Sequence, residues 1–371
     1  MGEFMTHLKS LFKEDDSLSA AERVAMGSLS ISGVSSVIWV VTEKCNLRCI
    51  HCYEGNREPQ RELSTEEAMR VIDRLYDAGK PLTFISGGEP LLRKDIYSIL
   101  GRLKELGFRV ILSTNGTLVD KAAERLASLE IDNIAIPLYG PQESHDSFTR
   151  MRGSHERVMR ALGLLRDLGM GLTVKTVVAR SVIPNLEYIF QMAQEFGART
   201  IYLCDLIMVG RATLLTQELP SKDDWRRILD WIIEQMILGN EYPEIEVDIG
   251  LHPSTAIYVM ESLRKKGYDV SEAEAKMRKR RLSVEGRGYL SISPTGDILI
   301  SNYTPIKLGN ALNDDLREVI RHPLYRAVGN SSKLRGWCGS CEYRDMCGGS
   351  RVKAYIYSGE LLGEDPTCLL H

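Results

Sequence analysis

The stretch EKCNLRCIHCYEGN (residues 43–56) places Cys45, Cys49 and Cys52 in a Cys-x3-Cys-x2-Cys spacing. It directly follows SVIWVVT (36–42), whose apolar and β-branched residues are typical of a buried strand. Three thiols on one short loop suit a metal centre, but a tetrahedral zinc site or a four-iron cluster takes four ligands. The loop therefore predicts an iron–sulfur centre with one open position, which could bind a small molecule.

Outward from this loop, apolar runs alternate with amphipathic stretches until about Gly210. The further predicted strands are 81–86, 108–114, 131–140, 171–179 and 200–208. The predicted helices between them are 64–79, which opens on a Ser-x-x-Glu capping box at Ser64, and 94–107, 118–129, 154–169 and 185–197. Six β-α units indicate an α/β fold with a parallel sheet and helices outside it.

The pattern breaks before the eight units that a closed barrel needs, so we predict a partial (β/α)6 TIM-like barrel. In such barrels the chemistry sits on the loops at the carboxyl ends of the strands. Four regions are predicted: an N-terminal segment 1–35, of which 1–4 resemble a tag remnant, a barrel 36–215, a helical linker region 216–285 and a C-terminal domain 286–371.

The two later regions have their own patterns. In the linker region we predict helices at 222–238 and 254–266, a short strand at 245–249 and a charged stretch at 270–282. The C-terminal domain begins with GYLSISPTGDILIS (288–301), two alternating runs around a turn that predict a β-hairpin. Loops and short helices are expected after it.

Composition narrows the function classes. The chain has 371 residues and a formal net charge of −3, which gives no basic field for nucleic acid. No apolar run approaches the ~20 residues of a membrane span, and no secretory signal precedes residue 36. We expect a cytoplasmic protein, in which eight cysteines indicate metal or redox chemistry rather than disulfides.

The cysteine loop resembles the hallmark of the radical S-adenosylmethionine (SAM) enzymes, CxxxCxΦC, where Φ is usually aromatic. Here Φ is His51, a poor fourth ligand because it is adjacent to Cys52. The resemblance implies that the three cysteines hold a [4Fe-4S] cluster whose open iron is bound by SAM. Such enzymes cleave SAM reductively to a 5′-deoxyadenosyl radical, which takes hydrogen from an unactivated C–H bond.

Two further stretches resemble motifs of the same SAM pocket. SGGEP (86–90) supplies Gly87, Gly88, Glu89 and Pro90, and STNGT (113–117) supplies Ser113 and Asn115. The glycines allow close backbone approach, and Glu89 is expected to accept hydrogen bonds from the methionyl ammonium.

Other positions around the pocket are less definite. Lys175 and Arg180 are candidates to hold the SAM carboxylate, with surface charge as the alternative. Pro137 and Tyr139 stand where many relatives have a Ser and an Asp, so we expect a SAM-ribose contact to be lost or moved.

The C-terminal cysteines Cys338, Cys341, Cys347 and Cys368 resemble the SPASM extension, in its truncated Twitch form. That form implies one auxiliary [4Fe-4S] cluster, and zinc is the alternative. Relatives with two auxiliary clusters carry cysteines where this chain has Ser301-Asn302 and Arg351. A cluster with four thiolates has no open iron, so electron transfer or site shaping is its expected role.

Cys204, in the predicted strand 200–208, is a buried small hydrophobe or a catalytic hydrogen-atom donor. His252 and His145 are expected to be loop or cap residues. Stretches near residues 202–212 and 347–368 are similar to enzymes that remodel haem-precursor side chains, which favours removal or oxidation of a tetrapyrrole propionate.

Alternatives remain open at this point. One is maturation of a peptide, although only about 35 residues precede the barrel, or of another small-molecule or cofactor precursor. A different class is a non-catalytic iron–sulfur electron carrier, which would have no use for SGGEP or STNGT. The expected partners are a small-molecule or peptide substrate and a low-potential electron donor such as ferredoxin or flavodoxin, with neither nucleic acid nor a membrane span.

Overall fold

The computed structural model describes residues 6–12, 33–55 and 61–371. The predicted tag remnant 1–4 and most of the N-terminal segment lie outside these ranges. The described strands are β1 (Thr6–His7), β2 (Ser36–Val40), β3 (Leu82–Ser86), β4 (Val110–Ser113), β5 (Asn133–Pro137), β6 (Leu172–Val178), β7 (Thr200–Asp205), β8 (Glu246–Gly250), β9 (Tyr289–Ile292), β10 (Asp297–Leu299) and β11 (Lys307–Asn310). They form one sheet in the order β1-β8-β7-β6-β5-β4-β3-β2-β9-β10-β11.

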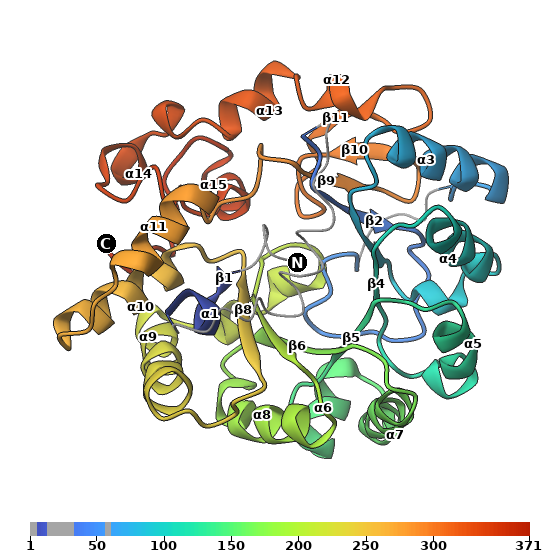
Figure 1. The fold of residues 1–371 in the computed structure, drawn as a ribbon, viewed down its shortest axis with the longest axis horizontal. Coiled ribbons are helices and arrows are strands. Elements are labelled where there is room, and N and C mark those ends of the chain that lie inside the picture. Colours follow the sequence, from blue (N-terminus) through green and yellow to red (C-terminus); the bar gives the residue numbers. More distant parts are fainter. Residues whose placement is uncertain (1–5, 13–32, 56–60) are drawn as a thin grey trace.

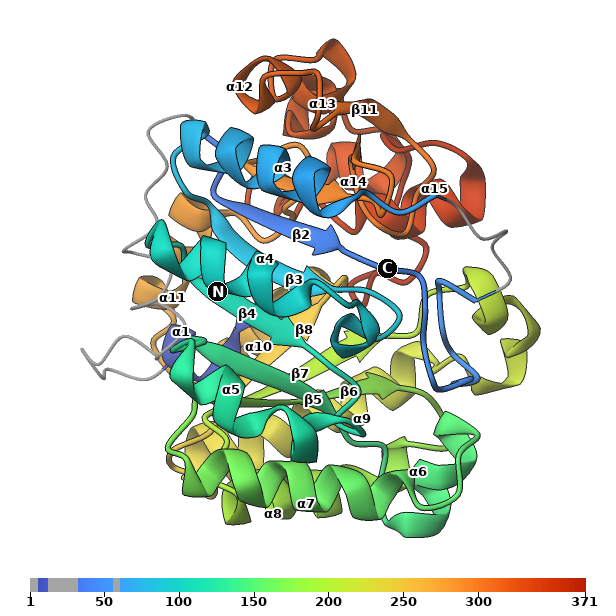
Figure 2. The same cartoon turned by 90° about the vertical axis from the view of Figure 1, so that its right-hand side faces the viewer.

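Helices surround the sheet on its outer side (Figure 1). Those of the first half are α1 (Leu8–Phe12), α3 (Thr65–Asp77), α4 (Ile96–Glu105), α5 (Ala123–Ser128), α6 (Gln142–Thr149), α7 (Ser154–Asp167) and α8 (Leu186–Glu195). Those of the second half are α9 (Lys222–Ile232), α10 (Ser254–Lys265), α11 (Ser271–Arg280), α12 (Leu316–Val319), α13 (Pro323–Val328), α14 (Gly336–Ser340) and α15 (Arg351–Ser358). Figure 2 shows α4, α5 and α7 running along the outside of the strands.

The partial α/β barrel is confirmed, but its sheet is longer than the six strands predicted. β2 to β8 pair in parallel in chain order, and β9 pairs in parallel with β2. The predicted linker strand is therefore β8, which continues the sheet beside β7, and the predicted hairpin enters the sheet through β9. The sheet stays open, because β1 and β11 end it at opposite edges.

Local sequence explains the outer helices. In α3 the side chain of Ser64 accepts from the Glu67 amide at 3.2 Å, and the Glu67 carboxylate accepts from the Ser64 amide at 2.8 Å. This is the predicted capping box, a feature whose removal typically costs about 1 kcal/mol. The buried residues Ala68, Val71, Ile72 and Leu75 then face the sheet at helical spacing.

The C-terminal region folds against the open side of the barrel, where α12 to α15 follow β11 (Figure 1). The charged stretch 270–282 is largely the helix α11. In the described part of the chain no helix is long and apolar enough to cross a membrane. The boundaries of the four regions remain a prediction.

Candidate active site

The loop after β2 brings the first three cysteines to the carboxyl ends of the strands. Cys45 is exposed, and Cys49 and Cys52 are partly exposed. Burial and the two neighbouring thiols raise the pKa of Cys49 to about 12. Three thiolates in one place repel one another, so the loop suits a centre whose iron ions supply positive charge.

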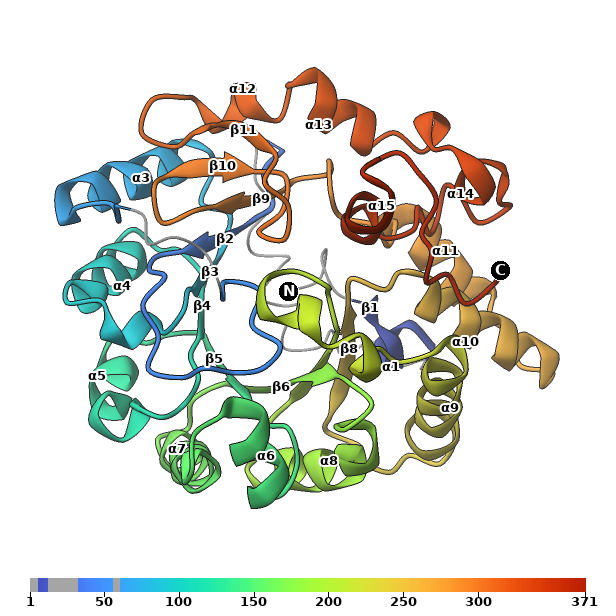
Figure 3. The same ribbon diagram turned by 180° about the vertical axis from the view of Figure 1, so that it is seen from behind.

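A segment after β7 anchors this loop. The Arg211 amide donates to the carbonyl of Cys52 at 3.0 Å, and its Nε donates to the carbonyl of Cys49 at 2.9 Å. Gly210 has a φ of +62°, and a Cβ there would lie 2.6 Å from the Cys52 carbonyl oxygen. Figure 3 shows the two segments side by side at the barrel mouth, the loop in blue and η4 (Gly210–Leu214) in yellow-green. No motif in the sequence predicted this anchor.

The SGGEP motif packs directly against the cysteine loop. The Gly88 amide donates to the Thr42 carbonyl at 2.8 Å, and the Glu89 amide donates to the Lys44 carbonyl at 2.7 Å. A Cβ at Gly87 would lie 2.6 Å from the Thr42 carbonyl oxygen, and one at Gly88 would lie 2.6 Å from that of Glu43. Both glycines are thus required for the close approach of the two loops.

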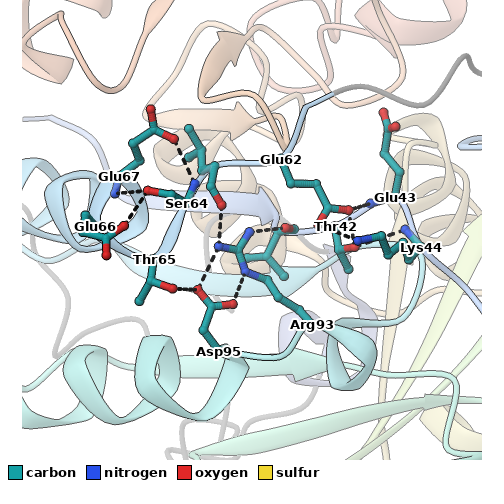
Figure 4. Close-up of polar contacts among 12 residues, drawn as sticks. Thr42, Glu43, Lys44, Glu62, Ser64, Thr65, Glu66, Glu67, Arg93 and Asp95 are labelled. Carbon is teal, nitrogen blue, oxygen red and sulfur yellow. Dashed lines mark hydrogen bonds and ion pairs between the residues drawn. The ribbon is translucent and has the colours of Figure 1, made fainter.

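A buried guanidinium fixes the base of the same loop (Figure 4). Arg93 donates to the carbonyls of Val41 at 2.7 Å and Leu63 at 2.8 Å, and it pairs with Asp95 at 2.7 Å. Asp95 also accepts from the Thr65 hydroxyl at 2.8 Å. The network joins the end of β2 to the start of α3, so it positions the residues that lead into the cysteine loop.

Glu89 connects SGGEP to STNGT and is fully buried. Its carboxylate accepts from the Thr114 hydroxyl at 2.8 Å, the Asn115 amide at 2.7 Å and the Leu91 amide at 3.0 Å. Burial raises the pKa of the carboxyl, while these donors oppose the rise. The structure therefore brings together the two motifs that the sequence placed on separate strands.

Asn115 extends this connection to the first cysteine. Its Nδ2 donates to the Asn46 side chain at 2.8 Å and lies 3.8 Å from the Sγ of Cys45. The Leu47 amide also donates to that sulfur at 3.4 Å. Such N–H···S contacts favour the thiolate form that a metal centre needs.

The two candidate cations behave differently. Lys175 is partly buried in the barrel and donates to the hydroxyl of Ser113, and burial lowers the pKa of its ammonium although Glu89 and Cys204 oppose this. Arg180 has 54% of its side chain exposed and pairs with Asp224 at 3.6 Å. Of the two cations, Lys175 lines the cavity described below, together with Ser113, and Arg180 does not.

His51 and Tyr139, two of the positions at which this sequence departs from the family pattern, contact each other. The Nε2 of His51 lies 3.2 Å from the Tyr139 hydroxyl, and the imidazole stacks on Phe148 with ring centroids 4.8 Å apart. Burial lowers the pKa of His51 to about 3, helped by the charges of Lys175 and Arg211. The ring is therefore neutral and packed like the aromatic residue that it replaces.

A cavity of about 270 Å³ extends from this site to the C-terminal region. Its wall includes five tyrosines, Tyr53, Tyr139, Tyr202, Tyr289 and Tyr303. Cys204 also lines it, with its sulfur 3.9 Å from the Tyr303 hydroxyl, and burial raises the pKa of this thiol to about 11. Ser301 and Asn302 line the cavity as well.

The last four cysteines lie near one another, Cys338, Cys347 and Cys368 being buried and Cys341 partly exposed. The charges of Cys338 and Cys341 contribute to a raised pKa of the Cys368 thiol, after burial. The Asp365 amide donates to the sulfur of Cys338 at 3.3 Å, and the Gly349 amide donates to that of Cys347 at 3.4 Å. In the described residues no three His, Cys, Asp or Glu side chains lie close enough together to hold one metal ion in common. A [4Fe-4S] cluster does not need such a group, because each of its thiolates binds a different iron.

A buried polar network, which the sequence did not reveal, joins this region to β7. Lys353 donates to Asp205 at 2.7 Å, and the Nδ1 of His252 lies 3.3 Å from the same carboxylate. The Nε2 of His252 lies 3.0 Å from the carbonyl of Thr367, beside Cys368. Burial, assisted by the charge of Lys353, lowers the pKa of His252 to about 4.

The comparisons with known proteins agree with this geometry. Residues 39–192 match the family model described as the Radical SAM superfamily. The AdoMet-dependent heme synthase of Methanosarcina barkeri is 30% identical over 339 residues, covering 90% of this chain and 95% of that one. The chain belongs to the radical SAM superfamily. Membership implies an enzyme that uses a [4Fe-4S] cluster and SAM.

Other relatives of this radical SAM protein extend the match along the chain. The Fe-coproporphyrin III synthase of Methanosarcina barkeri is 27% identical over 354 residues and covers 90% of this chain and 87% of that one. The crystal structure of Streptococcus suis SuiB bound to the precursor peptide SuiA superposes with a TM-score of 0.72 at 19% identity, covering 92% of this chain and 77% of that one. The shared fold therefore includes the SPASM-type extension as well as the barrel.

Proposed function

We propose that this radical SAM enzyme removes or oxidises a propionate side chain of a haem-precursor tetrapyrrole. The observation that carries the proposal is the match, over 90% of the chain, to relatives named for haem and Fe-coproporphyrin synthesis. The tyrosine-lined cavity supports it, because tyrosine rings offer faces and edges on which a flat aromatic ligand packs. At about 270 Å³ the cavity is at the low end of ligand pockets, so a macrocycle enters by one edge and its side chain goes deeper.

Cys45, Cys49 and Cys52 hold the cluster that binds SAM in this proposal. When bound, this centre supplies a 5′-deoxyadenosyl radical that removes a hydrogen atom from the substrate. Glu89, through its bonds to Thr114 and Asn115, keeps the SAM-binding loops in register. Lys175 supplies a partly buried positive charge beside Ser113 for a carboxylate, and Gly87, Gly88 and Pro90 keep the pocket wall close to the cysteine loop.

Cys338, Cys341, Cys347 and Cys368 hold one auxiliary [4Fe-4S] cluster. Conversion of a propionate to a vinyl group removes one hydrogen atom and then one molecule of CO2, and it leaves one electron that needs an acceptor. The cavity reaches from the cysteine loop to Ser350, close in sequence to Cys347, so an acceptor there lies beside the substrate. We further propose a low-potential donor such as ferredoxin or flavodoxin, and a cytoplasmic location.

The test is anaerobic reconstitution followed by reduction with excess SAM, with iron-coproporphyrin III, metal-free coproporphyrin III or no substrate added. Iron is counted on the intact protein and on a variant with Cys45, Cys49 and Cys52 changed to Ala. We expect about eight irons to fall to about four in the variant. We also expect 5′-deoxyadenosine only from the intact protein, and a porphyrin product that has lost CO2.

Each result bears on a different part of the proposal. Iron that is unaffected by the three substitutions, or zinc in its place, would overturn the cluster assignment. Formation of the nucleoside without any change in either porphyrin would overturn the assignment of the substrate and favour a peptide or another cofactor precursor in its place.

A further inference from the structure

Arg351 is a charged side chain at the centre of the C-terminal region. It is the first residue of α15 and is only 1% exposed, which places it among the largest fully buried side chains of the described chain. It stands where the sequence pattern of relatives with two auxiliary clusters has a cysteine. The structure shows what this chain has built there instead.

The groups that contact its guanidinium are three backbone carbonyls, which carry no formal charge, and one thiol. Nη1 donates to the carbonyls of Leu361 at 3.0 Å and Gly363 at 2.6 Å, and Nε donates to that of Gly349 at 3.3 Å. Nη2 lies 3.7 Å from the sulfur of Cys338. No ion pair joins Arg351 to any carboxylate of the described residues.

The two acids near it are bound to other groups. Glu285 is held by the hydroxyl of Ser283 at 3.3 Å. Asp365 accepts from the amides of Ser350 at 2.7 Å and Thr367 at 3.0 Å. Neither carboxylate contacts the guanidinium directly, although the charge of Arg351 acts on the buried Glu285 carboxyl and opposes the rise of its pKa on burial.

The backbone is shaped to bring the guanidinium and the thiol together. Gly349 has a φ of +62°, and a Cβ there would lie 2.6 Å from the Nη2 of Arg351 and 2.9 Å from the sulfur of Cys338. Only glycine leaves this space open in a left-handed conformation without strain. The contact between Arg351 and Cys338 is therefore a built feature of the loop.

A buried guanidinium carries a large desolvation penalty unless a negative charge lies close to it. Four thiolates around a doubly positive [4Fe-4S] core leave a net charge of two minus. We propose that the auxiliary cluster is the counter-ion of Arg351, and that Arg351 is a positioning residue that raises the reduction potential of this cluster. The inference rests on the proposed auxiliary cluster and deepens its role as electron acceptor.

The direction of the effect follows from charge. Uptake of one electron changes the core from 2+ to 1+, so the cluster becomes more negative by one charge. A fixed positive charge and an N–H···S contact at Cys338 stabilise the reduced form more than the oxidised form. The electron is the one that the substrate radical releases as CO2 leaves and the vinyl group forms.

The experiment uses the full chain with Cys45, Cys49 and Cys52 changed to Ala, so that only the auxiliary cluster contributes iron and spectral signal. Arg351→Gln removes the charge, Arg351→Lys keeps it, and Arg344→Gln is the matched control. Arg344 lies between Cys341 and Cys347 in sequence, but its side chain is 38% exposed and lies 3.7 Å from Asp345. The readouts are iron content and a potentiometric titration followed by electron paramagnetic resonance.

We expect Arg351→Gln to lower the ratio of reduced to oxidised cluster at fixed potential about tenfold, a shift of ~59 mV to more negative values for one electron. Arg351→Lys should retain most of the parent value, and Arg344→Gln should match the parent. Absence of iron from the parent itself would overturn the auxiliary cluster, and with it this part of the proposed function. An unchanged potential in an iron-loaded Arg351→Gln protein would overturn the inference about Arg351 alone. Loss of iron from both Arg351 variants would also overturn it, because hydrogen bonding rather than charge would then be the role of Arg351.

Discussion

The two cysteine groups of this protein differ in how open they are. The group at the barrel mouth supplies three thiols, of which Cys45 is exposed, and His51 and Tyr53 of the same loop line the cavity. The C-terminal group supplies four thiols, three of them buried, and Arg351 and Asp365 close around Cys338. An open group can exchange a small ligand such as SAM, whereas a closed group can pass electrons but cannot bind a substrate. In the proposed function, the two cysteine groups thus serve different purposes because they differ in the number of their ligands and in their burial.

The largest effect is expected from removal of the closed C-terminal cysteine group. Changing Cys347 and Cys368 to Ala should lower the iron content by about four per chain. The rate of SAM cleavage should stay within a few-fold of the parent value, because its site is intact. The amount of modified substrate should fall by about a hundredfold or more, because the electron acceptor is missing. Iron analysis, nucleoside assay and mass spectrometry of the product measure the three quantities.

Cys204→Ala is the control for this double variant, since Cys204 belongs to neither cysteine group and should leave the iron content unchanged. If the double variant lost SAM cleavage as completely as substrate modification, the division of roles between the two groups would be wrong.

A smaller effect is expected inside the open site. Glu89→Gln removes the charge that holds Thr114 and Asn115, and hydrogen bonds to charged groups contribute about 1.5–3 kcal/mol. The dissociation constant of SAM should therefore rise roughly ten- to a hundredfold. Equilibrium binding of SAM to the reconstituted protein measures it.

Arg180→Gln provides the matched control, because Arg180 lies outside the cavity. This variant should bind SAM as the parent protein does. Equal losses in the Glu89 and Arg180 variants would show that Arg180 reaches the SAM carboxylate after all.

The smallest effect concerns the joint between barrel and extension. The pKa of His252 is about 4 in the folded protein, below its ordinary value of 6.5. Below pH 6.5 the unfolded chain therefore binds a proton that the folded chain does not bind. Stability is therefore lost as the pH falls from 6.5 towards 4. At pH 5.5 the loss from this one group is about 1 kcal/mol.

Denaturant unfolding of the reconstituted protein at pH 7.5 and pH 5.5 measures this loss. His252→Gln should have a shallower pH dependence. Part of the slope should remain, because the pKa of His145, in the barrel, is also lowered to about 4 by burial. An identical slope in the variant would mean that His252 is already protonated in the folded state.

Local sequence was sufficient for the elements and for much of the site. The capping box at Ser64 and the hairpin around residues 293–296 formed as predicted, because both depend on contacts within a few residues. The positions of Glu89 and Asn115 at strand ends followed from the order of β-α units, since parallel strands bring their carboxyl ends to one edge.

The sequence pattern did not predict the long-range pairing of strands and side chains. β8 looked like an isolated strand in a linker, and only its register with β7 made it part of the sheet. The anchor at Gly210 and Arg211 and the network of Asp205, Lys353 and His252 likewise join residues far apart in the chain. Such contacts depend on how whole elements pack, which periodicity does not encode.

The features that predict the chemistry can be read from the sequence alone: the number of thiols in each group, their spacing, and the glycines and acid of the SAM motifs. Spacing suffices there because each set of ligands or loop residues is largely local. The packing of the folded chain was needed to show that Lys175 and not Arg180 lines the cavity, and that Arg351 lies beside Cys338 without direct contact to a carboxylate in the described chain. Burial and charge pairing are properties of the packed molecule, because they depend on side chains that other elements bring to the same place.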